Sequence, residues 1–368
     1  MKTAIVGAGA IGGWMGARLA HAGCPVSALA RGETLAALQR HGLQLAENGK
    51  TFAHPIQTSA SAADLGAQEL VVIAVKAPSM AQVAQSIAPL LGPDTLVLTA
   101  MNGVPWWFFD GFGGALQGTR LQTIDPNGAI AQAIPAHHTL GCVVHASCSL
   151  RGPGFVQHHF GNKLIIGEPS GVKTARVQQL AALLTQAGFE APVANQIQQD
   201  TWYKLWGNMT VNPVSALTGA TTDKILADPL VRQFISAVML EAKEIGARLG
   251  LAIAQQPEDR HAVTLKLGAF KTSMLQDLES SKPVELDALV AVVRELGQMT
   301  GVATPNTDTL LGLSRLQAQV RGPPARACPS WRAAWPQALP PRARQSGLGR
   351  VVELCCLWVH WVQVLGLE

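Results

Sequence analysis

Two patterns of apolar residues divide the chain. Up to about residue 193, short apolar runs of strand length alternate with helical segments. We expect strands over residues 2–6, 25–30, 70–75, 95–99, 140–147 and 163–167, a short strand near 191–194, and helices over 81–91 and 175–187. This alternation predicts an α/β domain with a mostly parallel sheet.

Beyond residue 195 the apolar positions follow the period of helices. We expect helices over residues 229–249, 258–270, 285–299 and 305–319, with prolines or an Asp-Pro pair near their starts. The sequence therefore predicts a Rossmann-type domain over 1–193 followed by an all-helical domain over 194–318. A ligand of both domains would bind between them, at the carboxyl ends of the strands.

Residues 319–368 differ in composition from the rest of the chain. They hold six arginines, no lysine, four of the nine tryptophans and three of the six cysteines. We expect a tail outside the domains, either disordered or translated from a shifted reading frame, and a partner-binding segment is the remaining alternative. The apolar run 351–367 is interrupted by Glu353, His360 and Gln363, which argues against a membrane span.

Composition and charge exclude several classes of protein. Apolar residues make up 48% of the chain and charged residues 14%, against roughly 25% in an ordinary domain, so a disordered or coiled-coil protein is excluded. The net charge of +4 resides in residues 319–368, which leaves the first 318 residues neutral and without the basic face of a nucleic-acid binder. Six cysteines without a pairing pattern indicate reduced thiols and a cytoplasmic protein.

A glycine-rich turn directly follows the first expected strand and precedes a helix. In the motif Gly-x-Gly-x-x-Gly, Gly7 permits a tight turn, Gly9 lets the backbone approach a pyrophosphate, and Gly12 lets the helix pack closely on the strand. We predict that the turn and the helix N-terminus bind a dinucleotide through the backbone of Gly7, Ala8, Gly9, Ala10, Ile11 and Gly12. A glycine-rich turn without a ligand is the alternative.

The residue that ends the second expected strand selects the cofactor. NAD requires an acidic side chain there, whereas the 2′-phosphate of NADP requires a cation. Arg31 occupies this position, and its guanidinium suits a phosphate. We therefore predict NADP(H), with a solvated loop arginine as the alternative.

Further polar residues follow the strands and line one helix. Lys76 comes directly after the expected strand 70–75, and Asn102 lies close to the end of the expected strand 95–99. Lys204, Asn208 and Asn212 are spaced four residues apart, so on one helix they share a face. Burying such a stripe among apolar neighbours is costly unless a polar group meets it.

These residues, together with Ser273 and Asp277 in Ser-Met-Leu-Gln-Asp and with Glu285, resemble the ketopantoate reductase (2-dehydropantoate 2-reductase) family over residues 1–318. The resemblance implies an oxidoreductase that uses NADPH to reduce a 2-oxoacid to a 2-hydroxyacid. The expected substrate is ketopantoate and the product pantoate, a step of pantothenate and coenzyme A biosynthesis. A related hydroxyacid or imine dehydrogenase and an inactive NADP-binding protein are the alternatives.

The resemblance also implies roles for individual residues. Lys204 would be the catalytic general acid, and Glu285 would orient that lysine and the substrate hydroxyl. Lys76 and Asn102 would lie beside the cofactor, with Asn102 also steadying the catalytic lysine. The substrate would be held by Asn208, Asn212 and Ser273. A homodimer is left open.

Other features leave the substrate in doubt or argue against a metal. Phe270 stands where family members carry a polar asparagine, and the aromatic run 106–109 could narrow or roof the pocket. Two histidine pairs, at 137–138 and 158–159, have no carboxylate or cysteine at metal-ligand spacing, so we predict no metal.

Overall fold

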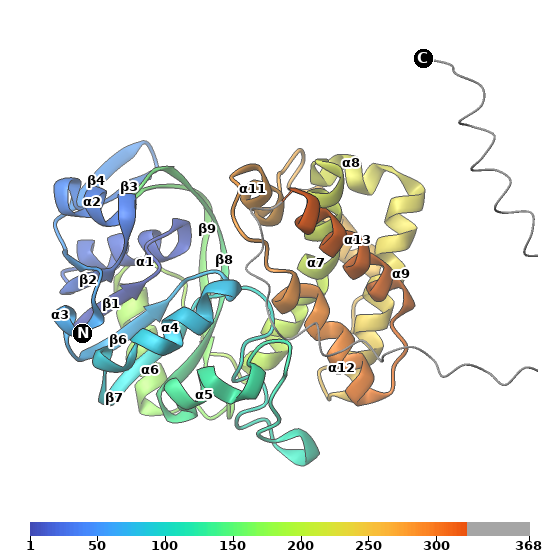
Figure 1. Cartoon of the computed structure of the whole chain (residues 1–368), viewed down its shortest axis with the longest axis horizontal. Helices are drawn as coiled ribbons and strands as arrows, with labels where there is room; N and C mark the ends of the chain where they lie inside the picture. Colours follow the sequence, from blue (N-terminus) through green and yellow to red (C-terminus); the bar gives the residue numbers. More distant parts are fainter. Residues whose placement is uncertain (322–368) are drawn as a thin grey trace, which may run out of the picture. The chain divides into compact units, whose positions relative to one another are not determined.

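The computed structural model describes residues 1–321, and the expectations for the tail beyond them lie outside the described residues. Nine strands form one sheet in the order β4-β3-β9-β8-β7-β6-β1-β2-β5 (Figure 1). Their bounds are β1 Thr3–Val6, β2 Val26–Leu29, β3 Leu43–Glu47, β4 Lys50–His54, β5 Gln57–Ser59, β6 Gln68–Ile73, β7 Leu91–Thr99, β8 Thr139–Gly152 and β9 Phe155–Gly167.

Six of the strands form the parallel sheet of a dinucleotide-binding fold. The strands β5-β2-β1-β6-β7-β8 pair in parallel, which is the Rossmann order 3-2-1-4-5-6. The chain runs outward from β1 on one side and returns to β6 on the other, so the turn after β1 lies at the point where the strand order reverses. The predicted α/β fold with a mostly parallel sheet is confirmed. The hairpins β8–β9 and β3–β4 extend the sheet, and β3, β4 and β5 were not anticipated from the sequence.

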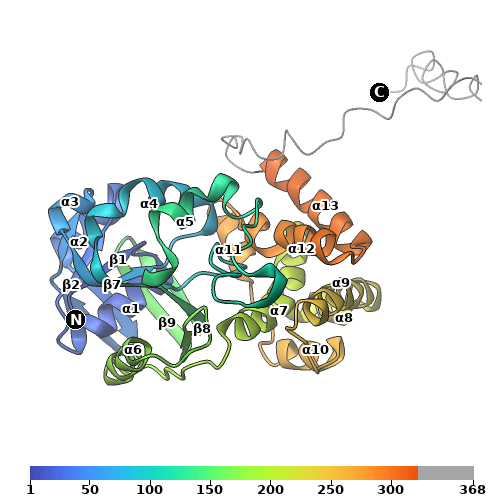
Figure 2. The same cartoon turned by 90° about the horizontal axis from the view of Figure 1, so that it is seen from below.

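Helices cover both faces of the sheet because its strands are apolar on both sides. Ile5 packs with helices α1 and α6 on one face, whereas Ala4 and Val6 pack with α3, α4 and α5 on the other. Figure 2 shows these two helical layers with the strands between them. The helices are α1 Ala10–His21, α3 Ala62–Leu65, α4 Met80–Ser86, α5 Ala129–Ala133 and α6 Ala175–Gln186, with α2 Gly32–His41 following β2.

The described chain after residue 195 is helical. Helix α7 (Ile197–Thr218) begins in the core of the sheet through Ile197 and continues into a second core through Trp202 and Trp206. Around it lie α8 Thr222–Ala227, α9 Pro229–Arg248, α10 Pro257–Leu265, α11 Ser273–Glu279, α12 Val292–Thr300 and α13 Pro305–Arg321. Among residues 1–321, no helix combines the length and apolar character that a bilayer crossing requires.

The boundary between the two predicted domains stays a prediction. The last bridge of the sheet joins Ile166 to Val193, and α7 begins at Ile197, so the change from sheet to helices falls beside the expected boundary at 193/194. All described residues nevertheless belong to one compact unit. We propose the two domains as units of architecture that share a packed interface.

The aromatic run 106–109 belongs to that interface, which corrects our expectation that it narrows or roofs the pocket. Trp106 and Trp107 pack in the core of the sheet, and Phe108 and Phe109 pack in the helical core. All four side chains are buried, and the Trp107 indole donates a hydrogen bond to Thr99 Oγ1 at 3.0 Å. Their size therefore serves the packing of the two halves on each other.

A second close contact lies where the loop after β7 meets a π-helical turn. Residues Asp287–Ala291 form this turn, which leads into α12. The Val104 amide donates to the Ala288 carbonyl at 3.0 Å, and Gly103 has a φ of +83°. A Cβ at position 103 would lie 2.4 Å from the Ala288 oxygen, so only glycine fits there. Widened helical turns of this kind are often found at functional sites.

We predict that Gly103→Ala destabilises the protein more than Gly113→Ala does. Both glycines have a φ near +80°, but a Cβ at position 113 would meet open space. The control Gly113→Ala should lower the free energy of unfolding by about 1–2 kcal/mol because of its backbone conformation. Gly103→Ala should lower it by about 1–3 kcal/mol more because its Cβ collides with Ala288. Urea unfolding of the two variants measures the difference, and equal losses would contradict the close contact.

Candidate active site

The glycine-rich turn has the shape that a pyrophosphate requires. Gly7 has a φ of +96°, and a Cβ there would lie 2.7 Å from Val75 Cγ1. A Cβ on Gly12 would lie 2.1 Å from the Gly7 carbonyl oxygen, so neither position accepts a side chain. In contrast, a Cβ on Gly9 would meet nothing within 4 Å, and no side chain caps α1 at this residue. Open space thus lies beside Gly9 at the uncapped start of α1, where an anion would be favoured.

Arg31 lies where the sequence places it, just after the carboxyl end of β2. It immediately precedes α2, its side chain is exposed, and it forms no ion pair with the described residues. A guanidinium in this position is available to a phosphate group near the sheet edge. Contact with the cofactor stays a prediction.

Lys76, Asp277 and Glu285 form a charged cluster between the sheet and the helical part. Lys76 Nζ lies 2.7 Å from Asp277 Oδ2 and 3.3 Å from Glu285 Oε2. Glu285 is only 4% exposed, and its other oxygen accepts the Ala77 amide at 3.0 Å. Burial by itself would lower the pKa of Lys76, but the carboxylates of Glu285 and Asp277 outweigh it and raise that pKa. Lys76 is therefore a fully compensated cation.

Lys204 reaches from α7 to the oxygen atoms of the sheet. Its Nζ donates hydrogen bonds to Asn102 Oδ1 at 2.8 Å and to the Val144 carbonyl at 2.6 Å. Val144 belongs to the part of β8 that extends beyond the carboxyl end of its parallel pairing with β7. The lysine thus lies at the edge of the sheet where open α/β folds bind their ligands.

The surroundings of Lys204 make its ammonium easier to deprotonate. Burial is the largest cause and lowers the pKa of Lys204 to about 8, and the positive charges of Arg260 and Lys76 act in the same direction. Cys142 and Glu285 oppose the shift without cancelling it. A lysine with this pKa can donate a proton near neutral pH.

The structure brings together only part of the predicted substrate site. A small cavity of about 20 Å³, enough for about one water molecule, is lined by Asn102, Lys204 and Asn208 among others. Asn212 lies one turn further along α7 and is 7% exposed, and Ser273 is half-buried at the start of α11, which packs against α7. Neither residue lines this cavity.

The contacts of Glu285 differ from the expectation that it orients Lys204. Its carboxylate is bonded to Lys76 and to the Ala77 amide, and its influence on Lys204 is through charge. Asn102 is the side chain that holds the Lys204 ammonium. Phe270, which replaces the expected polar residue, lies near Phe160 of β9, with 6.2 Å between the ring centroids.

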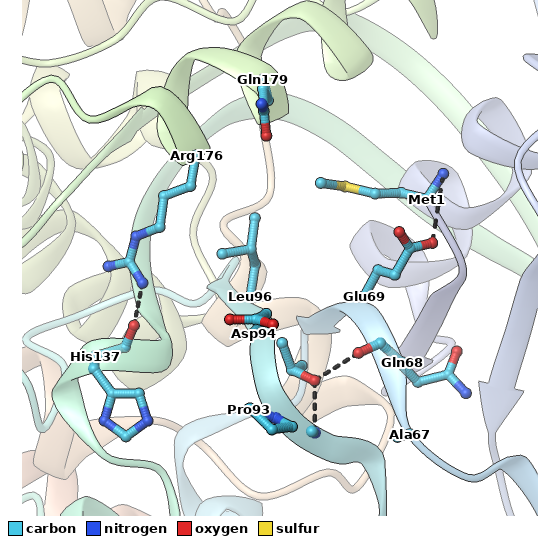
Figure 3. A pocket seen from close by; sticks show the side chains of 12 residues that line it. Met1, Ala67, Gln68, Glu69, Pro93, Asp94, Leu96, His137, Arg176 and Gln179 are labelled. Carbon is cyan, nitrogen blue, oxygen red and sulfur yellow. Dashed lines mark hydrogen bonds and ion pairs between the residues drawn. The ribbon is translucent and has the colours of Figure 1, made fainter.

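A wider hollow of about 740 Å³ lies elsewhere on the sheet. Figure 3 shows its lining, with Glu69 and Asp94 on one side and the Arg176 guanidinium turned toward the His137 carbonyl. This hollow lies at the amino ends of β6 and β7, opposite the edge that carries the glycine turn. Ligands of such sheets bind at the carboxyl ends, so we do not place the chemistry here.

Arg260, which lies on α10 beside the Lys204 helix, was not predicted as a site residue. A glycine within an apolar helix can mark a close approach by another group, and Gly207, three residues after Lys204, is such a glycine. The neighbour that this glycine accommodates is the Arg260 side chain. Gly207 alone could not have identified that neighbour, because α10 lies fifty residues further along the chain.

Comparison with known proteins identifies relatives over most of the chain. The family model described as ketopantoate reductase PanE/ApbA matches residues 3–107, and the model of the C-terminal part of that family matches residues 196–318. A 2-dehydropantoate 2-reductase from Mesorhizobium japonicum is 46% identical over 323 residues, which are 88% of this chain and 99% of the relative.

Solved structures show the same similarity. A provisionally named ketopantoate reductase from Ralstonia solanacearum is 57% identical, with a TM-score of 0.84 over 87% of this chain and 98% of that one. The 2-dehydropantoate 2-reductase from Geobacter metallireducens is 27% identical, with a TM-score of 0.75 over 86% and 99% of the two chains. The similarity covers both the sheet and the helical part.

We predict that Lys204 titrates near pH 8 and that Asn102→Asp raises its pKa. A carboxylate in place of the Asn102 amide would stabilise the ammonium that it contacts at 2.8 Å. The ε-carbon NMR signal of Lys204, assigned with Lys204→Arg, reports the midpoint. The exposed Asn195→Asp, just before α7, serves as the control and should leave the midpoint unchanged. A midpoint at the ordinary value of 10.5 in the unaltered protein would contradict the buried environment.

Proposed function

The chain belongs to the ketopantoate reductase family, and we propose that it is an NADPH-dependent oxidoreductase that reduces 2-dehydropantoate (ketopantoate) to pantoate. The observation that carries the proposal is the Lys204 ammonium, which two oxygen atoms hold at the carboxyl edge of the sheet. The pathway that uses pantoate is pantothenate and coenzyme A biosynthesis.

The glycine turn and Arg31 fit the cofactor. The backbone of residues 7–12 would hold the pyrophosphate at the start of α1, where no side chain fills the space in front of Gly9. Arg31 would meet the 2′-phosphate that distinguishes NADP from NAD. When bound, NADPH supplies the hydride that the reduction requires.

Lys204 supplies the proton for the keto oxygen. Reduction of a keto group places negative charge on its oxygen, so an ammonium nearby stabilises that charge and completes the reaction by proton transfer. Two of the three ammonium hydrogens are donated to Asn102 and Val144. One hydrogen is left for the substrate oxygen, and the fixed acceptors set its direction.

The remaining polar residues position the reactants. Glu285 keeps Lys76 and the Ala77 amide in place beside the end of β6, and we assign it to the active site for that reason. Lys76 and Asn102 would border the nicotinamide region. Asn208, Asn212 and Ser273 would bind the polar groups of the substrate, and all these roles stay proposals.

We also infer that the enzyme acts in the cytoplasm, because the three described cysteines, Cys24, Cys142 and Cys148, are free thiols. A homodimer stays a prediction. A dimeric ketopantoate reductase from Staphylococcus aureus has a related fold at 19% sequence identity, a level that supports the fold only.

We predict that Lys204→Met lowers kcat/KM for 2-dehydropantoate by at least about 100-fold, because the reaction loses its proton donor. Affinity for NADPH should stay within about twofold. Activity of the unaltered enzyme should fall as the pH rises above about 8, where Lys204 loses its proton. Stopped-flow and steady-state assays of NADPH oxidation measure both effects. The exposed Lys224→Met is the matched control, and equal activity of the two variants would refute the role of Lys204.

We predict that Arg31→Asp weakens the binding of NADPH and shifts the cofactor preference toward NADH. Loss of a charge-assisted contact to the 2′-phosphate should raise the KM for NADPH by about 10- to 100-fold. An aspartate could instead accept hydrogen bonds from the ribose of NADH. The ratio of kcat/KM for the two cofactors reports the change, with the exposed Arg40→Asp on α2 as the control. An unchanged ratio in Arg31→Asp would exclude Arg31 from the cofactor site.

A further inference from the structure

Arg260 of α10 lies against the helix that carries Lys204. Its guanidinium carbon is 5.4 Å from the centroid of the Tyr203 ring. A Cβ at position 207 would lie 2.5 Å from Arg260 Nε and 2.8 Å from a terminal nitrogen, so Gly207 makes room for the guanidinium. Because Gly207 is one turn along α7 from Lys204, this packing brings a second cation to the Lys204 region of the helix.

This cation has no counter-charge in the part of the chain that the structure describes. Arg260 forms no ion pair among residues 1–321, and its buried Nε has no hydrogen-bond acceptor there. The other partly buried arginines each have an acidic partner: Arg18 pairs with Glu47, Arg120 with Asp110, Arg176 with Glu168, Arg294 with Asp308 and Arg315 with Asp287. A half-buried guanidinium without an anion is unfavourable, so its position indicates an anionic ligand.

The charges of the active site single out the same residue. Lys76 is compensated by Asp277 and Glu285, and Lys204 is the group that gives up its proton. The positive charge of Arg260 contributes to the lowered pKa of both Lys204 and His145. Lys163 also acts on His145, but its ammonium is paired with Glu190 at 2.8 Å. The keto group that meets Lys204 carries a carboxylate on the adjacent carbon.

We propose that Arg260 binds the carboxylate of the 2-oxoacid substrate and thereby determines the preference for acids over their neutral derivatives. The inference rests on the proposed function, since it names the substrate group that this cation recognises. A guanidinium can form two parallel hydrogen bonds with a carboxylate, and it keeps its charge over the whole range in which Lys204 titrates. Asn208, Asn212 and Ser273 are then free to bind the hydroxyl group of the substrate.

The test compares Arg260→Met and Arg260→Lys with Arg232→Met, an exposed arginine of α9 without an ion pair among the described residues. Each protein is assayed with 2-dehydropantoate and with its lactone, which has the keto group but no carboxylate. We expect Arg260→Met to raise the KM for the acid by roughly 30-fold or more, and to leave the lactone nearly unaffected. Arg260→Lys should fall in between, and Arg232→Met should behave as the unaltered enzyme.

A fluorescence titration with NADPH accompanies these assays, and it should give the unaltered Kd for each variant. This binding shows that a variant is folded, and Arg260→Lys decides the matter if Arg260→Met fails to bind. An unchanged KM for the acid in Arg260→Met would overturn the proposal. Weaker binding of NADPH with an unchanged preference for acid over lactone would also overturn it, because that result would assign Arg260 to a cofactor phosphate. If none of the 2-oxoacids tested causes the unaltered enzyme to oxidise NADPH, the proposed function itself fails, and this inference fails with it.

Discussion

The hydrogen bonds from the Lys204 ammonium to Asn102 and Val144 are the interaction on which the active site depends. The lysine comes from the helical part, but both of its acceptors belong to the sheet or the loop that follows it. Lys204 can therefore reach them only while α7 is anchored on the sheet. That anchor is apolar, because Ile197 is buried in the sheet core and Trp202 and Trp206 are buried in the helical core. The direction of the proton donor is thus set by hydrophobic packing of its neighbours on α7, from Ile197 to Trp206.

A second set of contacts fixes the other side of the same site. Glu285 binds the Ala77 amide and Lys76, and three residues later the Ala288 carbonyl accepts the Val104 amide. Both contacts come from the segment around the π-helical turn, which tolerates no side chain at position 103. The loops after β6 and β7 are therefore attached to one short stretch of the helical part. Lys76 and Asn102, which follow those strands, are held in a fixed spacing as a result.

Much of this arrangement could be predicted from local sequence. The buried runs 70–75 and 95–99 and the glycine turn indicated the parallel sheet, because each carries its pattern within a few residues. The strands β4 and β5 were missed because they are short and have no buried residue, and β3 was missed because its five residues include only two large apolar side chains, Leu43 and Leu45. The partners of Glu285 and the position of Arg260 depend on contacts between residues far apart in the chain. No spacing rule describes such contacts, and the aromatic run 106–109 was misinterpreted as a pocket wall for the same reason.

The lowered pKa of Lys204 also has a cost in folding. In the unfolded chain this amine would keep its proton up to its ordinary pKa of 10.5, whereas in the native protein it releases the proton at about 8. Between these values the unfolded state binds more protons, so alkaline conditions shift the equilibrium toward the native state through this group. Below pH 8 the native state has to accommodate a charge that its surroundings disfavour. The acidity that suits Lys204 for proton donation is thus obtained at the expense of conformational stability at neutral pH.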